Sequence, residues 1–235
     1  MDQRKILGVI GGMGPQATQS FYQDIINNTV AEKDQDHIDM VIINHASMPD
    51  RTGAILSGDT KNVFQKLLED ANKLNTFGVD YIAMPCNTSH YFIDKLKLET
   101  GFNFVDMIEE TAKAIKSNGL SKVGLMATDG TITSNIYKTK MEQFGIEVIY
   151  PSEIMQKKVM EIIYDQIKAG KEPSVESFSA VSTELENLGA KIIILGCTEL
   201  SYYAQINKLG ELYIDAQKVL VRKSIELCGG KLVDF

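Results

Sequence analysis

Short apolar runs alternate with segments of helical periodicity along the whole chain, and this alternation limits the possible folds more than any other feature. The apolar runs are rich in β-branched residues and are expected to be buried strands; they lie at 5–10, 40–44, 81–85, 104–106, 123–127, 146–150, 192–195 and 212–215. Helical periodicity lies between them, as in 60–77, 133–144, 155–169 and 175–188. Glycines typical of left-handed helix C-caps follow several helical segments: Gly78, Gly119, Gly145, Gly170, Gly189 and Gly229. The alternation predicts a parallel α/β architecture with helices on both sheet faces.

The two halves of the sequence resemble each other. A strand, a glycine turn, a hydroxyl-rich helix start and a tyrosine occur in GVIGGMGPQATQSFY, from Gly8, and again in GLMATDGTITSNIY, from Gly124. The strand before Cys86 has a counterpart before Cys197, 111 residues later. A near-constant spacing of this kind indicates an internal duplication, so we expect two similar α/β lobes.

Length, composition and charge exclude several classes of protein. The chain has 235 residues, of which 44% are hydrophobic and 23% are charged, as in folded globular proteins. The net charge of -7 and the pI near 5.1 argue against nucleic acid or an anionic membrane as a partner, because both bind clustered cations. No apolar run approaches the roughly 18 residues of a membrane span. The first residues lack the pattern of a signal peptide, so the cytoplasm is the expected location.

The cysteines and histidines form neither a disulfide pattern nor a metal-binding pattern. Cys86, Cys197 and Cys228 are odd in number and widely spaced, so we expect reduced thiols. The sequence holds no CxxC pair, and its three histidines fall outside HExxH spacing. No metal site is therefore predicted.

Two of the cysteines occupy matching positions at the ends of predicted strands. Cys86 is followed by Asn87-Thr88-Ser89 and Cys197 by Thr198-Glu199, so each thiol precedes a predicted helix start. Ligands of open α/β sheets bind beyond the carboxyl ends of the strands, and a helix N-terminus lowers the pKa of a nearby thiol toward neutrality. A single cysteine of this kind is more often a small core residue, but its repetition in both halves predicts a site. Cys228 lacks this context and is expected in the core.

Two thiols on opposite sides of a bound carbon can invert its configuration. One removes a proton as a thiolate while the other delivers a proton to the opposite face, which is the chemistry of racemisation or epimerisation. Hydrolysis by a cysteine nucleophile needs a histidine partner and an oxyanion hole. His90 lies four residues after Cys86 and leaves such a nucleophilic pair open, although that scheme gives the second cysteine no role.

Two further segments are candidates for binding an anionic group. The turn at 11–15 can bring backbone amides to an anion at a helix start, and tight strand-to-helix packing explains it equally well. The turn departs from GxGxxG, so no dinucleotide site is predicted. The GxxxxGK[ST] phosphate loop is also absent, so kinase or nucleotide hydrolase chemistry lacks its main part. Arg51 follows a strand in Met48-Pro49-Asp50-Arg51-Thr52 and can hold a carboxylate through two N–H groups, although a surface arginine is the more common case.

Three motifs carry a family resemblance: IGGMGP at 10–15, PCNTSH at 85–90 and GCTEL at 196–200. In this order and at these distances they resemble the aspartate/glutamate racemase family, in particular its aspartate racemase branch, and the similarity extends over essentially the whole chain. Glutamate racemases typically start with a DSG-type turn and carry GCTHYP at the second cysteine. Ser89 stands where the family often has alanine.

The resemblance implies a cofactor-independent amino-acid racemase, commonly a homodimer, with an active site in the cleft between two pseudo-symmetric lobes. Because family members cross back to the first lobe at their end, the implied lobes are residues 1–102 with 213–235, and residues 103–212. The resemblance assigns the two acid/base roles to Cys86 and Cys197. Residues that match substrate contacts of the family are Met13, Arg51, Asn87, Thr88 and Lys168. Without the resemblance, Lys168 is explained as a helix C-terminal cation.

The sequence therefore predicts an enzyme that interconverts L- and D-aspartate, with glutamate as the alternative substrate. Arg51 and Lys168 are expected to hold the distal carboxylate, while Asn87, Thr88 and Thr198 hold the α-carboxylate and stabilise the carbanion-like transition state. Related chemistry in the same cleft is the alternative: hydantoin racemisation, maleate isomerisation or decarboxylation of a malonate-type acid. A two-lobed binding protein without turnover is a third hypothesis, which the paired thiols disfavour.

Overall fold

The computed structural model describes residues 4–233, which form two compact units. Unit 1 comprises the chain up to Met107 together with the segment from Gln217 onward, and unit 2 comprises Ile108–Ala216. Both boundaries lie slightly later in the chain than residues 102 and 212, where the family resemblance places them. The two units are described separately below.

A parallel three-stranded sheet forms the centre of unit 1. Its strands are β1 (Ile6–Gly11), β2 (Asp39–Asn44) and β3 (Tyr81–Ala83), in the order β2-β1-β3. β1 pairs with β2 along its full length and with β3 from Leu7 to Val9. Phe104 adds only an isolated parallel bridge to Ile82, where the sequence predicted a fourth strand over 104–106.

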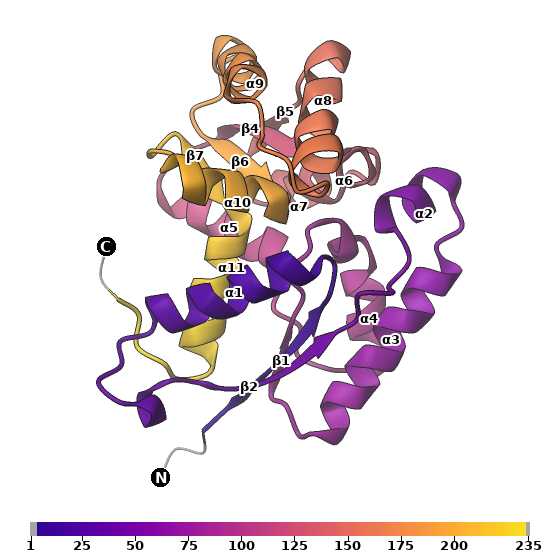
Figure 1. The fold of residues 1–235 in the computed structure, drawn as a ribbon, viewed down its shortest axis with the longest axis vertical. Helices are drawn as coiled ribbons and strands as arrows, with labels where there is room; N and C mark the ends of the chain where they lie inside the picture. Colours follow the sequence, from indigo (N-terminus) through magenta and orange to yellow (C-terminus); the bar gives the residue numbers. More distant parts are fainter. Residues whose placement is uncertain (1–3, 234–235) are drawn as a thin grey trace. The chain divides into compact units, whose positions relative to one another are not determined.

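Helices cover both faces of the unit 1 sheet. They are α1 (Pro15–Asn28), η1 (Asp34–Asp36), α2 (Arg51–Ser57), α3 (Lys61–Thr76), η2 (Thr88–Phe92), α4 (Ile93–Thr100) and α11 (Ala216–Leu227). Alternate residues of a strand point to opposite faces of the sheet. On one face, Ile10 of β1 packs in one cluster with Phe64 and Leu67 of α3. Figure 1 shows α3 and α4 on one side of β1 and β2, and α1 and α11 on the other.

Unit 2 repeats the strand order of unit 1. Its parallel sheet has the order β5-β4-β6-β7, with β4 (Lys122–Ala127), β5 (Glu147–Ile149), β6 (Ile193–Gly196) and β7 (Tyr213–Asp215). β4 begins 116 residues after β1 and has the same length, and each is flanked by the next two strands of its own unit. The predicted fold class, a pair of similar α/β units with parallel sheets and flanking helices, is confirmed.

Two separate clusters of apolar side chains lie on the two faces of the unit 2 sheet. The helices are α5 (Met107–Ser117), α6 (Asp129–Thr133), α7 (Ile136–Gln143), α8 (Glu153–Met160), η3 (Glu161–Ile167), α9 (Val175–Asn187) and α10 (Thr198–Asn207). Val123 and Leu125 of β4 pack in one cluster with residues of α5 and α7. Met126, on the opposite face, packs with residues of η3, α9 and α10.

Two of the predicted helices are not uniform. The segment 133–144 is interrupted, because α6 ends at Thr133 and Asn135 adopts a left-handed φ of 56° before α7 begins. The segment 155–169 starts as α8 and continues as η3, which is π-helical. Periodicity over a window of residues does not detect such local changes, because the pattern of apolar positions is nearly the same on both sides of them.

The six glycines that the sequence marks as helix ends all have φ between 69° and 98°. This is the left-handed region, which a Cβ atom disfavours. The helix ends were therefore predicted correctly from glycine placement.

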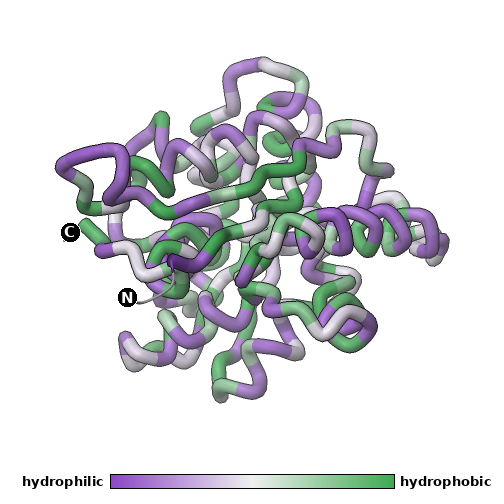
Figure 2. The backbone as a smooth tube through the Cα atoms, turned by 90° about the horizontal axis from the view of Figure 1, so that it is seen from below, coloured by the Kyte–Doolittle hydropathy of each residue, from purple (hydrophilic) through white to green (hydrophobic). Residues whose placement is uncertain are grey.

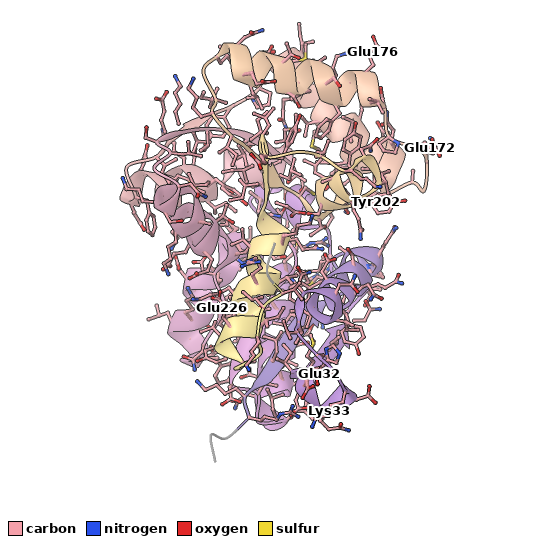
Figure 3. The ribbon with its side chains drawn as sticks, turned by 90° about the vertical axis from the view of Figure 1, so that its left-hand side faces the viewer. Glu32, Lys33, Glu172, Glu176, Tyr202 and Glu226 are labelled. Atoms are coloured by element: carbon pink, nitrogen blue, oxygen red, sulfur yellow. The ribbon has the colours of Figure 1, made fainter. Side chains whose placement is uncertain are left out.

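Polar and apolar residues alternate along the coiled segments of the backbone, as expected of helices with one buried face (Figure 2). Charged side chains lie at the surface of each unit, for example Glu32 and Lys33 in unit 1 and Glu172 and Glu176 in unit 2 (Figure 3). Among the helices of residues 4–233, none combines the length and the hydropathy that crossing a bilayer requires.

Candidate active site

Cys86 lies just beyond the carboxyl end of β3 in unit 1. The chain turns after Ala83, and the Cys86 N–H donates to the Met84 carbonyl at 2.7 Å. The thiol-bearing residue is buried, with 6% of its surface exposed. The segment that follows is the five-residue 3-10 turn η2, which Asn87 precedes. Because η2 leads directly into α4, a helical segment starts two residues after Cys86, as the sequence predicted.

His90 is not positioned to act as a base for the Cys86 thiol. Its Nδ1 lies 3.0 Å from the Cys86 carbonyl oxygen, and its Nε2 accepts from the Met107 N–H at 3.1 Å. Because Nε2 accepts, the ring proton is assigned to Nδ1, which donates to the carbonyl. Burial lowers the pKa of His90 below its ordinary value and favours the neutral ring. The nucleophilic Cys–His pair left open by the sequence thus has no support in unit 1.

Three motifs that are far apart in the sequence meet around Met13 of unit 1. Ser89 donates its hydroxyl to the Met13 sulfur at 3.1 Å. Arg51, the first residue of α2, donates from its guanidinium to the carbonyls of Met13, Met48 and Pro49 at 2.9–3.3 Å. The glycine turn, the loop before α2 and the segment after Cys86 therefore form one neighbourhood, and the guanidinium is held in place by backbone oxygens.

The glycine turn itself is required by close packing. The Gly12 N–H donates to the Thr18 hydroxyl at 2.8 Å, and Thr18 in turn donates to the Gly14 carbonyl at 3.1 Å. Gly12 has a φ of 87°, and a Cβ atom there would collide with the backbone of His45. The packing explanation of the turn is thus correct, and it fixes the position of Met13.

Cys197 occupies the N-cap position of α10 in unit 2, directly after β6. Its carbonyl accepts from the N–H groups of Leu200 and Ser201 at 3.0 and 3.2 Å, which is the geometry of a helix start. The residue is buried, with 7% of its surface exposed. The predicted strand–cysteine–helix order is confirmed in this unit.

The expectation of a near-neutral pKa for the Cys197 thiol is wrong. Burial, followed by the negative charge of Glu199, raises the pKa of Cys197 well above its ordinary value, while Lys168 acts in the opposite direction. The helix N-terminus does not outweigh these two effects. The prediction of a near-neutral pKa considered the helix but neither the depth of the thiol nor its carboxylate neighbour.

Lys168 lies at the C-terminal end of η3 and forms an ion pair with Glu199. The Glu199 carboxylate also accepts from the Cys197 thiol at 2.8 Å and from the Thr198 hydroxyl at 3.2 Å. Sequence reasoning quoted Glu199 as part of a motif but gave it no role. The sequence feature that could have indicated a role for Glu199 is its place two residues after Cys197, in the first turn of a helix.

The structure groups the predicted residues by unit. Met13 and Arg51 lie near the segment that follows Cys86, where Asn87 and Thr88 are buried. In unit 2, Lys168, Cys197 and Thr198 share contacts with one carboxylate.

Cys228 behaves as the sequence predicted. It is buried in unit 1 near the end of α11, and burial raises its pKa to about 11. Within residues 4–233, no group of three or more His, Cys, Asp or Glu side chains is arranged to hold a metal ion.

The structure thus has a duplicated α/β fold with a buried thiol at the equivalent strand end of each unit. The family model described as Asp/Glu/hydantoin racemase matches residues 10–223. The chain belongs to this family, and it is an amino-acid racemase.

Individual relatives agree with this assignment. A protein of Bacillus subtilis (strain 168), described as broad specificity amino-acid racemase RacX, is 30% identical over 204 residues, which cover 83% of this chain and 86% of that protein. A glutamate racemase of Persephonella marina is 27% identical over 182 residues, which cover 72% of this chain and 68% of that protein. The structure of Picrophilus torridus aspartate racemase superimposes with a TM-score of 0.84 at 30% identity, covering 97% of this chain and 96% of that one.

Proposed function

We propose that this racemase interconverts L- and D-aspartate with Cys86 and Cys197 as its two acid/base groups and without a cofactor. The observation that carries the proposal is the equivalent placement of the thiols, each just beyond the strand that pairs with the central β1 or β4. The mechanism requires the two sulfur atoms to face opposite sides of the substrate α-carbon. One thiolate then removes the α-proton while the other thiol protonates the opposite face.

The cations of the two units support an acidic substrate. Arg51 is held by three backbone carbonyls, and an arginine fixed in this way loses little freedom when it binds a carboxylate. Lys168 is 29% exposed at its side chain and carries three donors. In the proposal these two groups hold the distal carboxylate of aspartate.

The α-carboxylate needs a second set of donors. Asn87, Thr88 and Thr198 lie beside the two thiols and are buried, so their amide and hydroxyl groups act in a site of low dielectric. Donors of this kind stabilise the negative charge that develops when the α-proton leaves. An α-proton next to a carboxylate is only weakly acidic, so the proposal also requires water to be excluded during turnover.

A second candidate is a wider substrate range. RacX, described as having broad specificity, is related to this chain over most of both lengths, and the Persephonella relative is a glutamate racemase. Hydantoin racemisation is a further candidate, because the family model includes hydantoin racemases. Maleate isomerisation and malonate-type decarboxylation use related carbanion or thiol chemistry.

The deciding experiment is α-hydrogen exchange in deuterated water after dialysis of the enzyme. L-aspartate is expected to incorporate deuterium and to lose its optical rotation, faster than glutamate and much faster than alanine or lysine. Comparable rates for neutral and acidic amino acids would favour the broad-specificity candidate. Unchanged rotation for both aspartate and glutamate would refute the substrate assignment, and hydantoin, maleate and malonate derivatives in the same panel would then identify the related chemistry.

The proposed enzyme is a homodimer, which is the state that the family resemblance implies. Sedimentation of the purified chain is expected to give twice the mass of 26.1 kDa.

A further inference from the structure

Glu199 connects the thiol of Cys197 to a cation. Both oxygens of its carboxylate are engaged: Oε2 accepts from the Cys197 sulfur at 2.8 Å and from the Thr198 hydroxyl at 3.2 Å, and Oε1 pairs with the Lys168 ammonium. The Glu199 side chain is only 10% exposed. The charged groups of unit 2 that act on the thiol are Glu199, from α10 itself, and Lys168, from the end of η3.

The contact between Cys197 and Glu199 must contain a proton. A carboxylate and a thiolate are both acceptors only, so a sulfur–oxygen distance of 2.8 Å requires a hydrogen between them. If both groups were ionised, two negative charges would face each other in a buried site, which is strongly unfavourable. The pair therefore holds one proton and one negative charge, and Lys168 supplies the balancing positive charge.

We propose that Glu199 is the positioning residue that accepts the Cys197 proton, so that Cys197 works as the base of one reaction direction. This inference rests on the proposed two-thiol racemisation. The sulfur–hydrogen bond breaks, the proton moves to Oε2, and the electron pair stays on sulfur. The thiolate then takes the substrate α-proton, the electron pair of that bond stays on the α-carbon, and Cys86 delivers its own proton to the other face. After product release, Glu199 loses its proton to water and Cys86 regains one from water.

The electrostatics of unit 2 support this role. Because burial and the charge of Glu199 raise the pKa of Cys197 well above its ordinary value, water near neutral pH leaves the sulfur protonated. An acceptor already in hydrogen-bond contact avoids the transfer of that proton to bulk solvent. Lys168 stabilises the charge that stays on the pair.

A purely structural role for Glu199 makes different predictions. As an acidic residue in the first turn of α10, it would stabilise the helix through the dipole. Its loss would then lower the stability of unit 2 and, through the lost charge, the pKa of Cys197, but it would leave kcat and the pH profile of the reaction unchanged.

The first test is a titration that needs no turnover. In a C86S/C228S background, Cys197 is the one thiol left, and its ionisation is followed by the ultraviolet absorbance of the thiolate. E199Q is expected to lower the pKa of Cys197 and K168M to raise it, because the two charges act on the thiol in opposite directions. The control is E184Q, which removes a carboxylate of unit 2 that contacts only Ser152 among the hydrogen bonds of the described residues, and it is expected to leave the titration unchanged.

The second test is the pH profile of aspartate racemisation. E199Q is expected to lower kcat about 100-fold, within the range of acid/base assistance, with KM changed less than about threefold. Its rate should rise with pH, about tenfold per unit, because hydroxide must now ionise the thiol. In the exchange assay the loss should fall mainly on the one enantiomer whose proton Cys197 removes.

The outcomes separate this inference from the proposed function. An unshifted thiol titration in both E199Q and K168M, or an unchanged kcat and pH profile in E199Q, would overturn the role of Glu199 even if the wild-type enzyme racemises aspartate. A wild type inactive on every amino acid, with both titration shifts as expected, would overturn the racemase proposal alone. If E199Q does not fold, E199D is measured in its place: its shorter side chain withdraws the carboxylate from the sulfur, and an unchanged kcat and pH profile would overturn the role of Glu199.

Discussion

The two units place a thiol at the same point of a repeated fold but surround it with different chemistry. In unit 1, the segment around Cys86 is held by backbone groups, by the neutral ring of His90 and by the hydroxyl of Ser89. In unit 2, Cys197 contacts the Glu199 carboxylate, which is paired with Lys168. The repeated backbone fixes where the thiols lie, and the side chains around each one set its electrostatic environment.

The two cysteines are therefore not interchangeable. The hydrogen bonds described around Cys86 come from backbone groups, a neutral imidazole and a hydroxyl, and such bonds fix a position without depending on pH near neutrality. A carboxylate and an ammonium next to a sulfur atom instead change the proton affinity of that sulfur.

Replacing either thiol should nearly abolish net racemisation. C86A and C197A are each expected to lower the rate by about 1,000-fold or more, because in the proposed mechanism each variant lacks one of the two groups that transfer protons. The remaining thiol can still exchange the α-hydrogen from its own side, so the two variants should incorporate deuterium into opposite enantiomers. Full activity in either variant would eliminate the two-thiol scheme. C228A serves as the control and should keep its activity.

The two cations should differ in which kinetic constant they control. R51K is expected to raise KM for aspartate about tenfold, equivalent to roughly 1.4 kcal/mol, because lysine cannot reproduce the fork held by three carbonyls. K168M should lower kcat as well, since Lys168 also pairs with Glu199. Steady-state kinetics with aspartate separate the two patterns. Equal effects on KM alone would show that both cations only bind substrate.

The neutral histidine of unit 1 should make stability depend on pH. Burial lowers the pKa of His90 in the folded state, so below the ordinary value of about 6.5 the unfolded chain binds more protons than the folded one. Stability is then complete above that pH and falls below it, with a slope of up to about 1.4 kcal/mol per unit. Urea unfolding of wild type and H90Q between about pH 5 and pH 8 measures this slope. H90Q should lose that part of the pH dependence; an identical slope in both proteins would contradict the neutral ring.

Much of the fold could be predicted because its causes are local. Apolar runs and glycine positions located the strands and the helix ends, and the repeated motifs indicated the duplicated architecture. The strand expected over 104–106 was reduced to one bridge at Phe104, because pairing depends on a neighbouring strand as well as on β propensity. Likewise, the left-handed Asn135 that separates α6 from α7 leaves no mark on the apolar pattern.

The site could be predicted only in part, since its electrostatics arise from contacts between distant segments. The positions of both cysteines followed from strand ends and motifs. The raised pKa of Cys197 did not, because it depends on burial and on a carboxylate whose partner, Lys168, lies 31 residues away along the chain. The sequence likewise marked Ser89 as a departure from the family but assigned it no contact.

The smallest expected effect concerns Ser89, whose hydroxyl is fully buried and donates to the Met13 sulfur. A thioether is a weak acceptor, so S89A should cost less than about 1 kcal/mol of unfolding free energy, at the low end for a hydrogen bond. The activity should change less than about threefold, since alanine keeps the packing and no charge is lost. Thermal unfolding and aspartate kinetics measure both quantities. A rate loss as large as that expected for E199Q would show that unit 1 also depends on a polar contact for proton transfer, and the asymmetry between the two thiols would then be wrong.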